Sequence, residues 1–342
     1  MELPSPSQLK KKYPLPPPIA NAISEWRNRA KDILQGKDSS LIAIVGPCSI
    51  HDPASALEYA QLLKKFSQEV DKTLFPIMRL FIEKPRTRLG WKGILYDPHL
   101  DGSDDIAKGL EISRKLFLEI AELGVPCASE ILEPLTAPYL DDLLVWGSIG
   151  ARTAASQPHR QMASGLPFPV GFKNDLYGEL DNAISGIVTA RTAQSHIGIN
   201  CEGKIAALKT RGNPLSHLVL RGANHCPNYD PLSIARAISL LKKNHLESQI
   251  LIDCSHGNSN KDPRRQQIVL ESVMAQRASG NEAIKGFMLE SHLFPGKQPL
   301  SCDPSLLRYG VSITDPCLGW SETEILLSIA AERSMSIHSV QK

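Results

Sequence analysis

The stretch LIAIVGPCSIHDPASALEYAQLLKKF, residues 41–66, contains the unit on which the predicted fold rests. Its first part, LIAIVGPCS at 41–49, is an apolar run of the length expected for a buried strand. Asp52 then provides an N-cap side chain, and Pro53 suits the first position of the amphipathic helix that follows. A buried strand that leads directly into a helix is typical of a parallel sheet.

Seven further apolar runs follow along the chain and alternate with amphipathic helical stretches. They are PIMRLFIEK (76–84), VPCASEIL (125–132), WGSIGAR (146–152), PVGFKN (169–174), HLVLRGA (217–223), ILIDCSH (250–256) and GFMLESH (286–292). Eight β–α units favour closure into a barrel over an open, doubly wound sheet. We therefore predict an α/β fold, a (β/α)8 TIM barrel that occupies residues 41–342.

The segment before the barrel, residues 1–40, is predicted to be an arm followed by a helix. Residues 1–18 are rich in Pro, Ser and Lys, and PLPPP at 14–18 predicts an extended or polyproline-like arm. Apolar residues then recur at helical spacing up to Gly36, which can end the helix: Ile19, Ile23, Trp26, Ala30 and Ile33. This apolar stripe needs a surface to cover, either in the barrel or in a second copy of the chain.

One segment does not fit the β–α repeat. HIGIN (196–200) and KIAALKT (204–210) are separated by three residues that include Gly203, a pattern that predicts a β-hairpin over about 196–210. The hairpin is inserted before strand six of the barrel. It is expected to serve regulation or an interface.

Composition excludes several classes of protein. The 342 residues include 38 basic and 36 acidic ones, a net charge of +2, which does not suggest nucleic-acid binding. No apolar run of membrane-spanning length and no secretory signal is present. The seven cysteines are scattered and lack C-x-x-C spacing, which favours a reducing compartment, and we expect the cytoplasm. Neither G-x-G-x-x-G nor a P-loop motif occurs.

Basic residues accompany the predicted strand ends, where a TIM barrel assembles its binding site. These six are Arg79, Lys84, Arg86, Arg152, Lys173 and Arg221. Each one could pair with a neighbouring carboxylate, but six cations at one barrel mouth favour a site for carboxylate and phosphate groups. Arg79 and Lys84 are five residues apart, so both reach one ligand only if the chain bends near Lys84.

Metal-ligating residue types also follow the strands. Cys48, His256 and Glu290 end three of the apolar runs, and Asp315 follows in SITDPCLGW. Together they suit one divalent ion such as Mn, Fe, Co or Zn, although a single cysteine after a strand is more often simply buried. Glu130 is a candidate for holding a water or a cation, with a structural ion pair as the alternative.

Short motifs resemble, in order, those of the class I 3-deoxy-D-arabino-heptulosonate 7-phosphate (DAHP) synthases, over residues 19–335 or so. They are GPCSIHD (46–52), EKPRT (83–87), GWKG (90–93), GART (150–153), GFKN (171–174), LRGA (220–223), DCSHGNS (253–259) and SITDPCLGW (312–320). The resemblance implies a (β/α)8 barrel. It also implies condensation of phosphoenolpyruvate with erythrose 4-phosphate and water, the first step of the shikimate pathway.

The resemblance assigns roles residue by residue. It implies a metal held by Cys48, His256, Glu290 and Asp315, and a catalytic group of Lys84, His256 and Cys48. It implies phosphoenolpyruvate binding by Arg79, Lys84, Arg152, Lys173 and Arg221 with the backbone of Gly150 and Ala151, and a water contact by Glu130. Erythrose 4-phosphate is expected at Lys84, Pro85, Arg86 and Thr87.

The family also implies regulation, whereas assembly is predicted from the apolar stripe of the N-terminal helix. Its members that respond to an aromatic amino acid bind this effector near the hairpin and the loop before GFKN, where serines line the cavity. This chain has Pro167 and Gly198 there, which argues against a phenylalanine-type pocket. Tyrosine, tryptophan, another effector or none remain open. A homodimer or homotetramer is expected, with the N-terminal arm and helix as the predicted contact.

Three alternatives remain beside this reading. The sister 3-deoxy-D-manno-octulosonate 8-phosphate synthases use the same chemistry, but there the strand-two lysine sits in a K-A-N-R pattern, whereas Pro85-Arg86-Thr87 follows it here. A non-catalytic paralogue would bind the same ligands and regulate a partner synthase. An aldolase of the Schiff-base type would use Lys84 or Lys173.

Overall fold

The computed structural model describes residues 2–340 except 87, 225 and 302, with side chains described as far as residue 335. Eight strands form a closed barrel in the order β1-β10-β9-β8-β5-β4-β3-β2, and every neighbouring pair is parallel. The strands are β1 (Leu41–Gly46), β2 (Leu74–Arg79), β3 (Cys127–Glu130), β4 (Trp146–Ile149), β5 (Val170–Lys173), β8 (His217–Leu220), β9 (Ile250–Asp253) and β10 (Ile284–Glu290). The predicted TIM barrel is confirmed.

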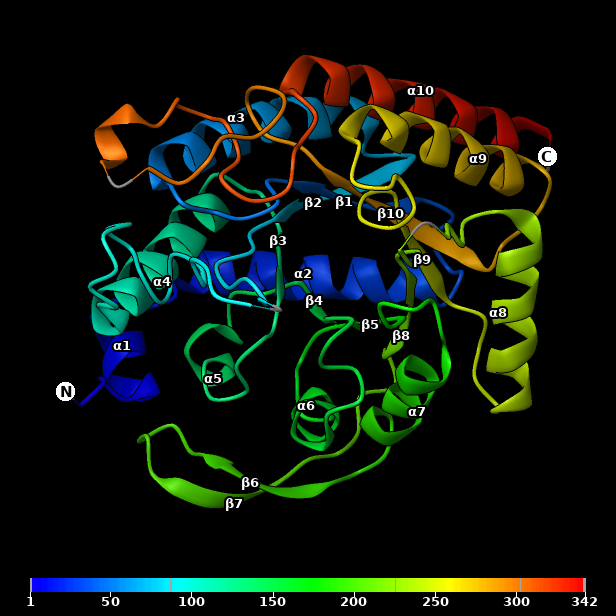
Figure 1. Cartoon of the computed structure of the whole chain (residues 1–342). Helices are drawn as coiled ribbons and strands as arrows, with labels where there is room; N and C mark the ends of the chain where they lie inside the picture. The colour runs from blue at the N-terminus through cyan, green and yellow to red at the C-terminus, as the bar shows by residue number, and fades with distance from the viewer. Residues whose placement is uncertain (1, 87, 225, 302, 341–342) are drawn as a thin grey trace.

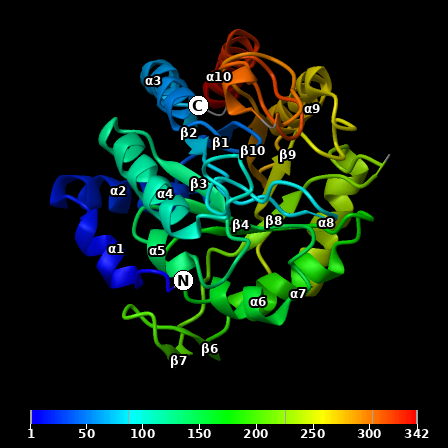
Figure 2. The same cartoon turned by 60° about the vertical axis from the view of Figure 1, so that its left-hand side comes forward.

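Helices surround the barrel on the outside (Figures 1 and 2). They are α3 (Pro53–Val70), α4 (Ile106–Glu122), α5 (Ala137–Leu140), α6 (Gln157–Ala163), α7 (Asp181–Ala190), α8 (Pro231–Lys243), α9 (Gln266–Ala278) and α10 (Trp320–Val340). Two short 3-10 turns, Pro263–Arg265 and Pro304–Leu306, lie in the loops. The start of α3 is as predicted, because the Asp52 side chain accepts hydrogen bonds from the backbone of Ala54 and Ser55.

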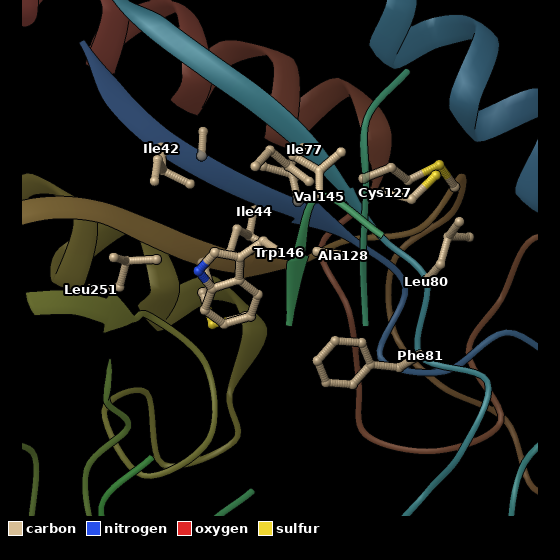
Figure 3. Close-up of a cluster of buried hydrophobic side chains, with 14 of the residues drawn as sticks. Ile42, Ile44, Ile77, Leu80, Phe81, Cys127, Ala128, Val145, Trp146 and Leu251 are labelled. Carbon is tan, nitrogen blue, oxygen red and sulfur yellow. The ribbon is translucent and has the colours of Figure 1, made fainter. Parts of the chain in front are cut away.

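The inside of the barrel is filled with side chains. Figure 3 shows Ile42, Ile44, Ile77 and Leu251 around Trp146, which is fully buried. The indole nitrogen of Trp146 donates to Nε2 of His217 at 3.1 Å, so its polar atom is satisfied. The barrel is therefore a packed core, and a ligand of the barrel would bind beyond the strand ends.

The N-terminal arm differs from the prediction, because part of it is helical. Helix α1 spans Pro6–Lys12, and a capping box between Ser5 and Gln8 starts it. Proline at the first helical position costs nothing, since the backbone N–H there has no partner inside the helix. For the same reason, α2 (Pro17–Leu34) begins within the proline run that was predicted to be extended.

Helix α2 covers the floor of the barrel with its apolar stripe. Ile23, Ala30, Ile33 and Leu34 are buried. The guanidinium of Arg27 donates to the carbonyl of Leu144, just before β4, and Gln249, just before β9, donates to the carbonyl of Leu34. The stripe is thus occupied by the barrel itself. It is not free to form the predicted contact with a second copy.

The predicted hairpin is confirmed between α7 and β8. Strands β6 (Ser195–Ile199) and β7 (Ile205–Lys209) pair in antiparallel fashion as a separate two-stranded sheet that lies outside the barrel (Figure 1).

Among the described residues, no helix has the length and apolar character that a bilayer span requires.

Candidate active site

A polar cavity of about 560 Å³ lies at the carboxyl ends of the barrel strands. Arg79, Glu130 and Lys173 end β2, β3 and β5 and reach it directly, and the remaining wall comes from the loops. The predicted site residues that line it are Arg79, Lys84, Pro85, Arg86, Glu130, Ala151, Arg152, Lys173, Arg221, His256 and Asp315. Thr87 lies outside the described residues. Predicted residues that are far apart in the chain therefore lie together at the mouth of the barrel.

A thiol and two carboxylates form a compact cluster at one side of this cavity. One ligand atom each from Cys48, Glu290 and Asp315 lies within 4.8 Å of the others. Cys48 follows β1 and Glu290 ends β10, which pairs with β1 through Gly46 and Glu290. A thiolate with carboxylates is a donor set that divalent transition ions accept. These residues therefore fit a metal ion.

His256, the fourth predicted ligand, borders this cluster. Its Nε2 is 3.6 Å from a Glu290 carboxylate oxygen. On the other side of the ring, Nδ1 is 2.9 Å from Asp253 and 2.8 Å from the Ser255 hydroxyl oxygen. A carboxylate behind an imidazole fixes the ring and raises its basicity, an arrangement common behind metal-binding histidines. Nε2 is therefore the nitrogen available to a metal.

Lys84 lies against the cluster. Its ammonium donates to the Cys48 carbonyl at 3.0 Å and lies 3.2 Å from the Cys48 sulfur. Burial raises the pKa of the Cys48 thiol, and Glu290 raises it further, while Lys84 opposes both. Burial would lower the pKa of Lys84, but Cys48 and Glu290 outweigh it and raise the pKa. The lysine is thus a fixed positive charge beside the cluster.

Arg79 is held rigidly at the base of the cavity. Its guanidinium pairs with Glu290 at 2.8 Å, donates to the Pro47 carbonyl at 3.1 Å and lies 3.5 Å from the centre of the Phe81 ring. One of its nitrogens, Nη1, is buried and has no hydrogen-bond partner among the described residues. Because buried N–H groups rarely lack an acceptor, a bound anion would supply the missing one.

Lys173 and Glu130 form a second rigid group. The Lys173 ammonium is 3.2 Å from Asp253 and 3.9 Å from Glu130. Glu130 Oε1 is buried without a hydrogen-bond partner among the described residues. Although burial raises the pKa of Asp253, His256 and Lys173 hold it well below its usual value. The buried carboxylate thereby orients the ammonium and the imidazole at once.

Gly150 makes room for the Glu130 carboxylate. A Cβ at position 150 would lie 2.4 Å from Glu130 Oε1, closer than any real contact. Gly150 itself is not part of the cavity wall, unlike Ala151. Its place in the GART motif thus has a steric reason that does not require contact with a ligand.

Arg221 is placed by an asparagine network. Asn174 accepts a hydrogen bond from the Arg221 backbone at 2.8 Å and donates to the Gly222 carbonyl at 3.0 Å. Burial lowers the pKa of Arg221, and the nearby charge of Arg152 lowers it further, against the opposing effect of Asp253. Two guanidinium groups that destabilise each other make a favourable place for an anion.

Some residues that line the cavity or orient its side chains were not predicted from the sequence. The Lys261 ammonium is 3.3 Å from an Asp315 oxygen, and Asp253 orients His256 and Lys173. Asp253 offered a signal, because it is the charged residue at the end of β9 in the DCSH motif. Arg88 and Tyr177 line the mouth from loops in which the sequence gives no such signal.

A second cavity, of about 480 Å³, lies outside the barrel. Its wall is formed by residues of the hairpin, by α5 and α6 with the loops that adjoin them, and by the loop that contains Gly165 and Leu166. Gly198 is part of this wall, and a Cβ there would lie 2.7 Å from Leu208. This is the region that the resemblance implies for an effector; Pro167 is not among the lining residues.

Comparisons with known proteins agree with this architecture. A family model described as the DAHP synthetase I family matches residues 18–328. The Tyr-sensitive phospho-2-dehydro-3-deoxyheptonate aldolase of Escherichia coli (strain K12) is 47% identical over 94% of this chain and 90% of its own. The Trp-sensitive aldolase of the same strain is 43% identical over 94% and 92%. A solved aldolase of this name from Francisella tularensis SCHU S4 has a TM-score of 0.95, 38% identity, and coverage of 98% and 97%.

Proposed function

This chain belongs to the DAHP synthetase I family, and from that premise we propose that it condenses phosphoenolpyruvate with erythrose 4-phosphate. C3 of phosphoenolpyruvate forms a bond to the aldehyde carbon, the oxygen of a water adds at C2, and the bond between C2 and the phosphate oxygen breaks. The products are DAHP and inorganic phosphate. This reaction opens the shikimate pathway, which leads to the aromatic amino acids.

The observation that carries the proposal is the set of buried cations at one barrel mouth. Arg79, Lys173 and Arg221 are each 5% exposed or less, and each lines the cavity. Buried cations in this number are stable when they face bound anions, and phosphoenolpyruvate offers a carboxylate and a phosphate. Fixing both substrates between cations makes their encounter effectively intramolecular.

Lys84 is the residue that we assign to the aldehyde. Its ammonium is held by the Cys48 carbonyl and sulfur, at the edge of the cluster where the two substrates would meet. As the carbon–carbon bond forms, negative charge grows on the aldehyde oxygen, and a fixed ammonium beside it lowers the barrier. Lys84 is also placed to give this oxygen a proton.

Glu130 is the residue that we assign to the water. Its Oε1 has no partner among the described residues, and Lys173 lies beside its other oxygen. A water that donates to Oε1 would satisfy this buried oxygen and would be held above C2 of phosphoenolpyruvate.

The cluster would hold one divalent ion, Mn, Fe, Co or Zn, through Cys48, Glu290, Asp315 and the Nε2 atom of His256. When bound, such an ion supplies Lewis-acid polarisation of the aldehyde. Pro85, Arg86 and Arg88 at the outer part of the cavity suit the phosphate of erythrose 4-phosphate, and Thr87 belongs to the same proposed segment.

A phosphate-release assay with two sugar phosphates tests the proposal. We expect turnover with erythrose 4-phosphate, none with arabinose 5-phosphate, and loss of turnover after chelation. The reverse sugar preference would identify the sister octulosonate synthase. Binding of phosphoenolpyruvate without turnover of either sugar would identify a non-catalytic paralogue. Borohydride trapping of a substrate on lysine, together with insensitivity to chelators, would identify a Schiff-base aldolase.

We further propose that the cavity beside the hairpin binds an aromatic amino acid that inhibits the reaction. Apolar side chains such as Pro138, Met162 and Leu208 suit an aromatic ring, while Asp141 and Arg211 provide charges of both signs for the ammonium and the carboxylate. Relatives that are Tyr-sensitive or Trp-sensitive by name support an effector of this class.

A further inference from the structure

A small cavity of about 70 Å³ lies at the amino ends of β1 and β10, at the opposite end of the barrel from the active site. Its wall includes the end of α2, the loop that leads from α2 into β1, the end of α9 and the first residues of β10. Two basic side chains line it, Arg277 from α9 and Lys285 from β10. The cavity shares no lining residue with the active site or with the cavity beside the hairpin.

Lys285 is directed toward this cavity by an irregularity in β10. In the pairing of β10 with β9, Ile284 lies opposite Ile250. The next pair joins Gly286 to Leu251, so Lys285 is an extra residue with none opposite it. An extra residue of this kind changes the direction of a side chain. All other residues of β10 are buried, whereas Lys285 is partly exposed.

The Lys285 ammonium lies beside the end of α2. Its Nζ is 3.3 Å from the position that a Cβ at Gly36 would occupy, so the glycine leaves room for the ammonium. Burial lowers the pKa of Lys285, and the charge of Arg277 lowers it further, against the opposing effect of Glu282. The two cations thus repel each other, and an anion between them would relieve this repulsion.

Arg277 has a buried donor that the protein does not use. Its Nε is buried without a hydrogen-bond partner among the described residues, and Nη1 donates to the Asn281 carbonyl at a long 3.4 Å. Burial lowers the pKa of Arg277, and Glu282 opposes this effect. Because buried N–H groups rarely lack an acceptor, an oxyanion in the cavity would complete the hydrogen bonds of this guanidinium.

The acidic residues of the wall do not take the place of such an anion. The Asp38 carboxylate accepts from the backbone of Ser40 at 2.8 Å and lies 3.4 Å from Nε of Arg29, so it is engaged elsewhere. Glu282 is exposed. Each cation also lies near the C-terminal end of a helix, where positive charge is favourable without any ligand. The experiment must therefore separate anion binding from this helix-end effect.

We propose that Arg277 and Lys285 bind one inorganic phosphate ion in this cavity. A tetrahedral oxyanion offers several acceptor atoms, so it can pair with Nε of Arg277 and with the Lys285 ammonium at once. The small volume suits an inorganic ion, whereas a sugar or a nucleotide would have to lie outside it. The bound ion would join α9 and β10 to the end of α2, which covers the floor of the barrel. This inference does not depend on the proposed reaction.

Calorimetric titration of the full chain with inorganic phosphate tests the inference. Saturating phosphoenolpyruvate occupies the active site, and chloride keeps the ionic strength constant. Lys285→Met and Arg277→Met should each weaken one phosphate site of wild type about ten- to hundredfold, the factor that a hydrogen bond to a charged group provides. Lys285→Arg, which keeps the charge, should retain part of the affinity.

Lys243→Met is the matched control, because Lys243 is an exposed basic residue in the last turn of α8 and is not part of the cavity wall. It should bind phosphate as wild type does. Thermal unfolding gives a second measurement: phosphate should raise the midpoint of wild type and Lys243→Met more than that of Lys285→Met. Lys285 is partly exposed, so its variant tests the site even if Arg277→Met does not fold.

Equal phosphate binding and equal stabilisation in wild type and both cavity variants would overturn the inference. Arg277 and Lys285 would then act only as charges at helix ends. Glycerol 3-phosphate serves as a further probe, since a phosphate monoester is too large for the cavity. If it bound as tightly as inorganic phosphate and lost this affinity in Lys285→Met, the assignment to a free phosphate ion would be wrong.

Discussion

At the scale of single residues, the site depends on polar atoms that the fold leaves without partners. Arg79 Nη1 and Glu130 Oε1 are buried and unpaired among the described residues, and both belong to side chains of the cavity wall. Such atoms destabilise the empty protein, and a ligand that pairs with them recovers this free energy on binding. The affinity of the site for a ligand thus comes partly from hydrogen bonds that the empty protein leaves unformed.

Cys48→Ala should abolish binding of one divalent ion while leaving the fold intact. The sulfur is one of three ligand atoms within 4.8 Å of one another, whereas the residue itself is small and its loss costs only about 1 kcal/mol of stability. Titration of the chelator-treated protein with Mn²⁺ or Zn²⁺ measures this. Cys254→Ala, which removes another buried thiol outside the cluster, should bind as wild type does. Equal affinity in both variants would remove Cys48 from the site.

Gly150→Ala should reduce kcat by an order of magnitude or more, because the added Cβ would push the Glu130 carboxylate from its position. Steady-state kinetics with both substrates measures this. The double variant Gly150→Ala, Glu130→Ala provides the control, since it should be no slower than Glu130→Ala alone. Additive losses would show that Gly150 acts through something other than Glu130.

Glu83 should make stability fall as the pH rises. Burial raises the pKa of Glu83 to about 8, although Leu132 and Thr136 donate to it. Because the pKa is higher in the folded protein, the protonated carboxyl contributes to stability. This contribution is lost as the pH rises from the unfolded-state pKa of about 4.3 toward 8. Urea unfolding should therefore show Glu83→Gln gaining about 3.5 kcal/mol over wild type at pH 8 relative to pH 5.

Glu69→Gln, at an exposed position, serves as the reference for this comparison. It should show the same difference from wild type at both pH values. A Glu83→Gln difference that is equally constant would mean that Glu83 is already ionised in the folded protein at pH 5.

At the scale of elements, the sequence predicted the barrel because each strand is a nearly continuous apolar run. The ends of the strands could not be read from these runs: β2 ends at Arg79, although the buried apolar run continues to Ile82. There the chain leaves the sheet, which is the bend that brings Lys84 and Arg79 to one cavity. Helix α1 was missed because proline favours both extended chain and a first helical turn.

The sequence likewise predicted some residues of the candidate site and not others. Residue type and position at a strand end were enough to nominate Cys48, Glu290 and Asp315, which the fold brings within 4.8 Å of one another. The partners that orient them were not predictable. The ion pair between Lys261 and Asp315 joins two loops, and loop paths depend on packing that periodicity does not encode.

Helix α2 should contribute strongly to stability because it seals the floor of the barrel. Ile33→Ala, at a position 1% exposed, should lower the free energy of unfolding by about 3 kcal/mol. Ile19→Ala, at the half-buried start of the same helix, should cost about 1 kcal/mol. Denaturant unfolding of both variants measures this. Equal, small losses would mean that α2 packs loosely on the barrel.

At the scale of the whole molecule, the hairpin offers an apolar outer face. Ile197 and Ile205 are 82% and 83% exposed, and the strand register places them on the same side of the two-stranded sheet. Since the stripe of α2 is already covered, we propose this face as the contact in a homodimer or homotetramer.

Ile205→Lys should therefore shift the sedimentation coefficient toward that of the monomer, because a buried unpaired ammonium opposes association. Leu232→Lys is the matched control, since Leu232 is also 83% exposed but lies on α8. It should sediment as wild type does. A single species of unchanged size in both variants would place the contact elsewhere.

The filled interior of the barrel also determines from which side a ligand can enter and leave the active site. Side chains such as Trp146 occupy the space beneath the cavity, and α2 covers the opposite end (Figures 1 and 3). A molecule bound at Arg79 must therefore arrive past the loop residues Arg86 and Arg88, and it must depart the same way. Erythrose 4-phosphate at the rim would block the path to the deeper ligand. The two substrates should therefore bind in a fixed order, with phosphoenolpyruvate first.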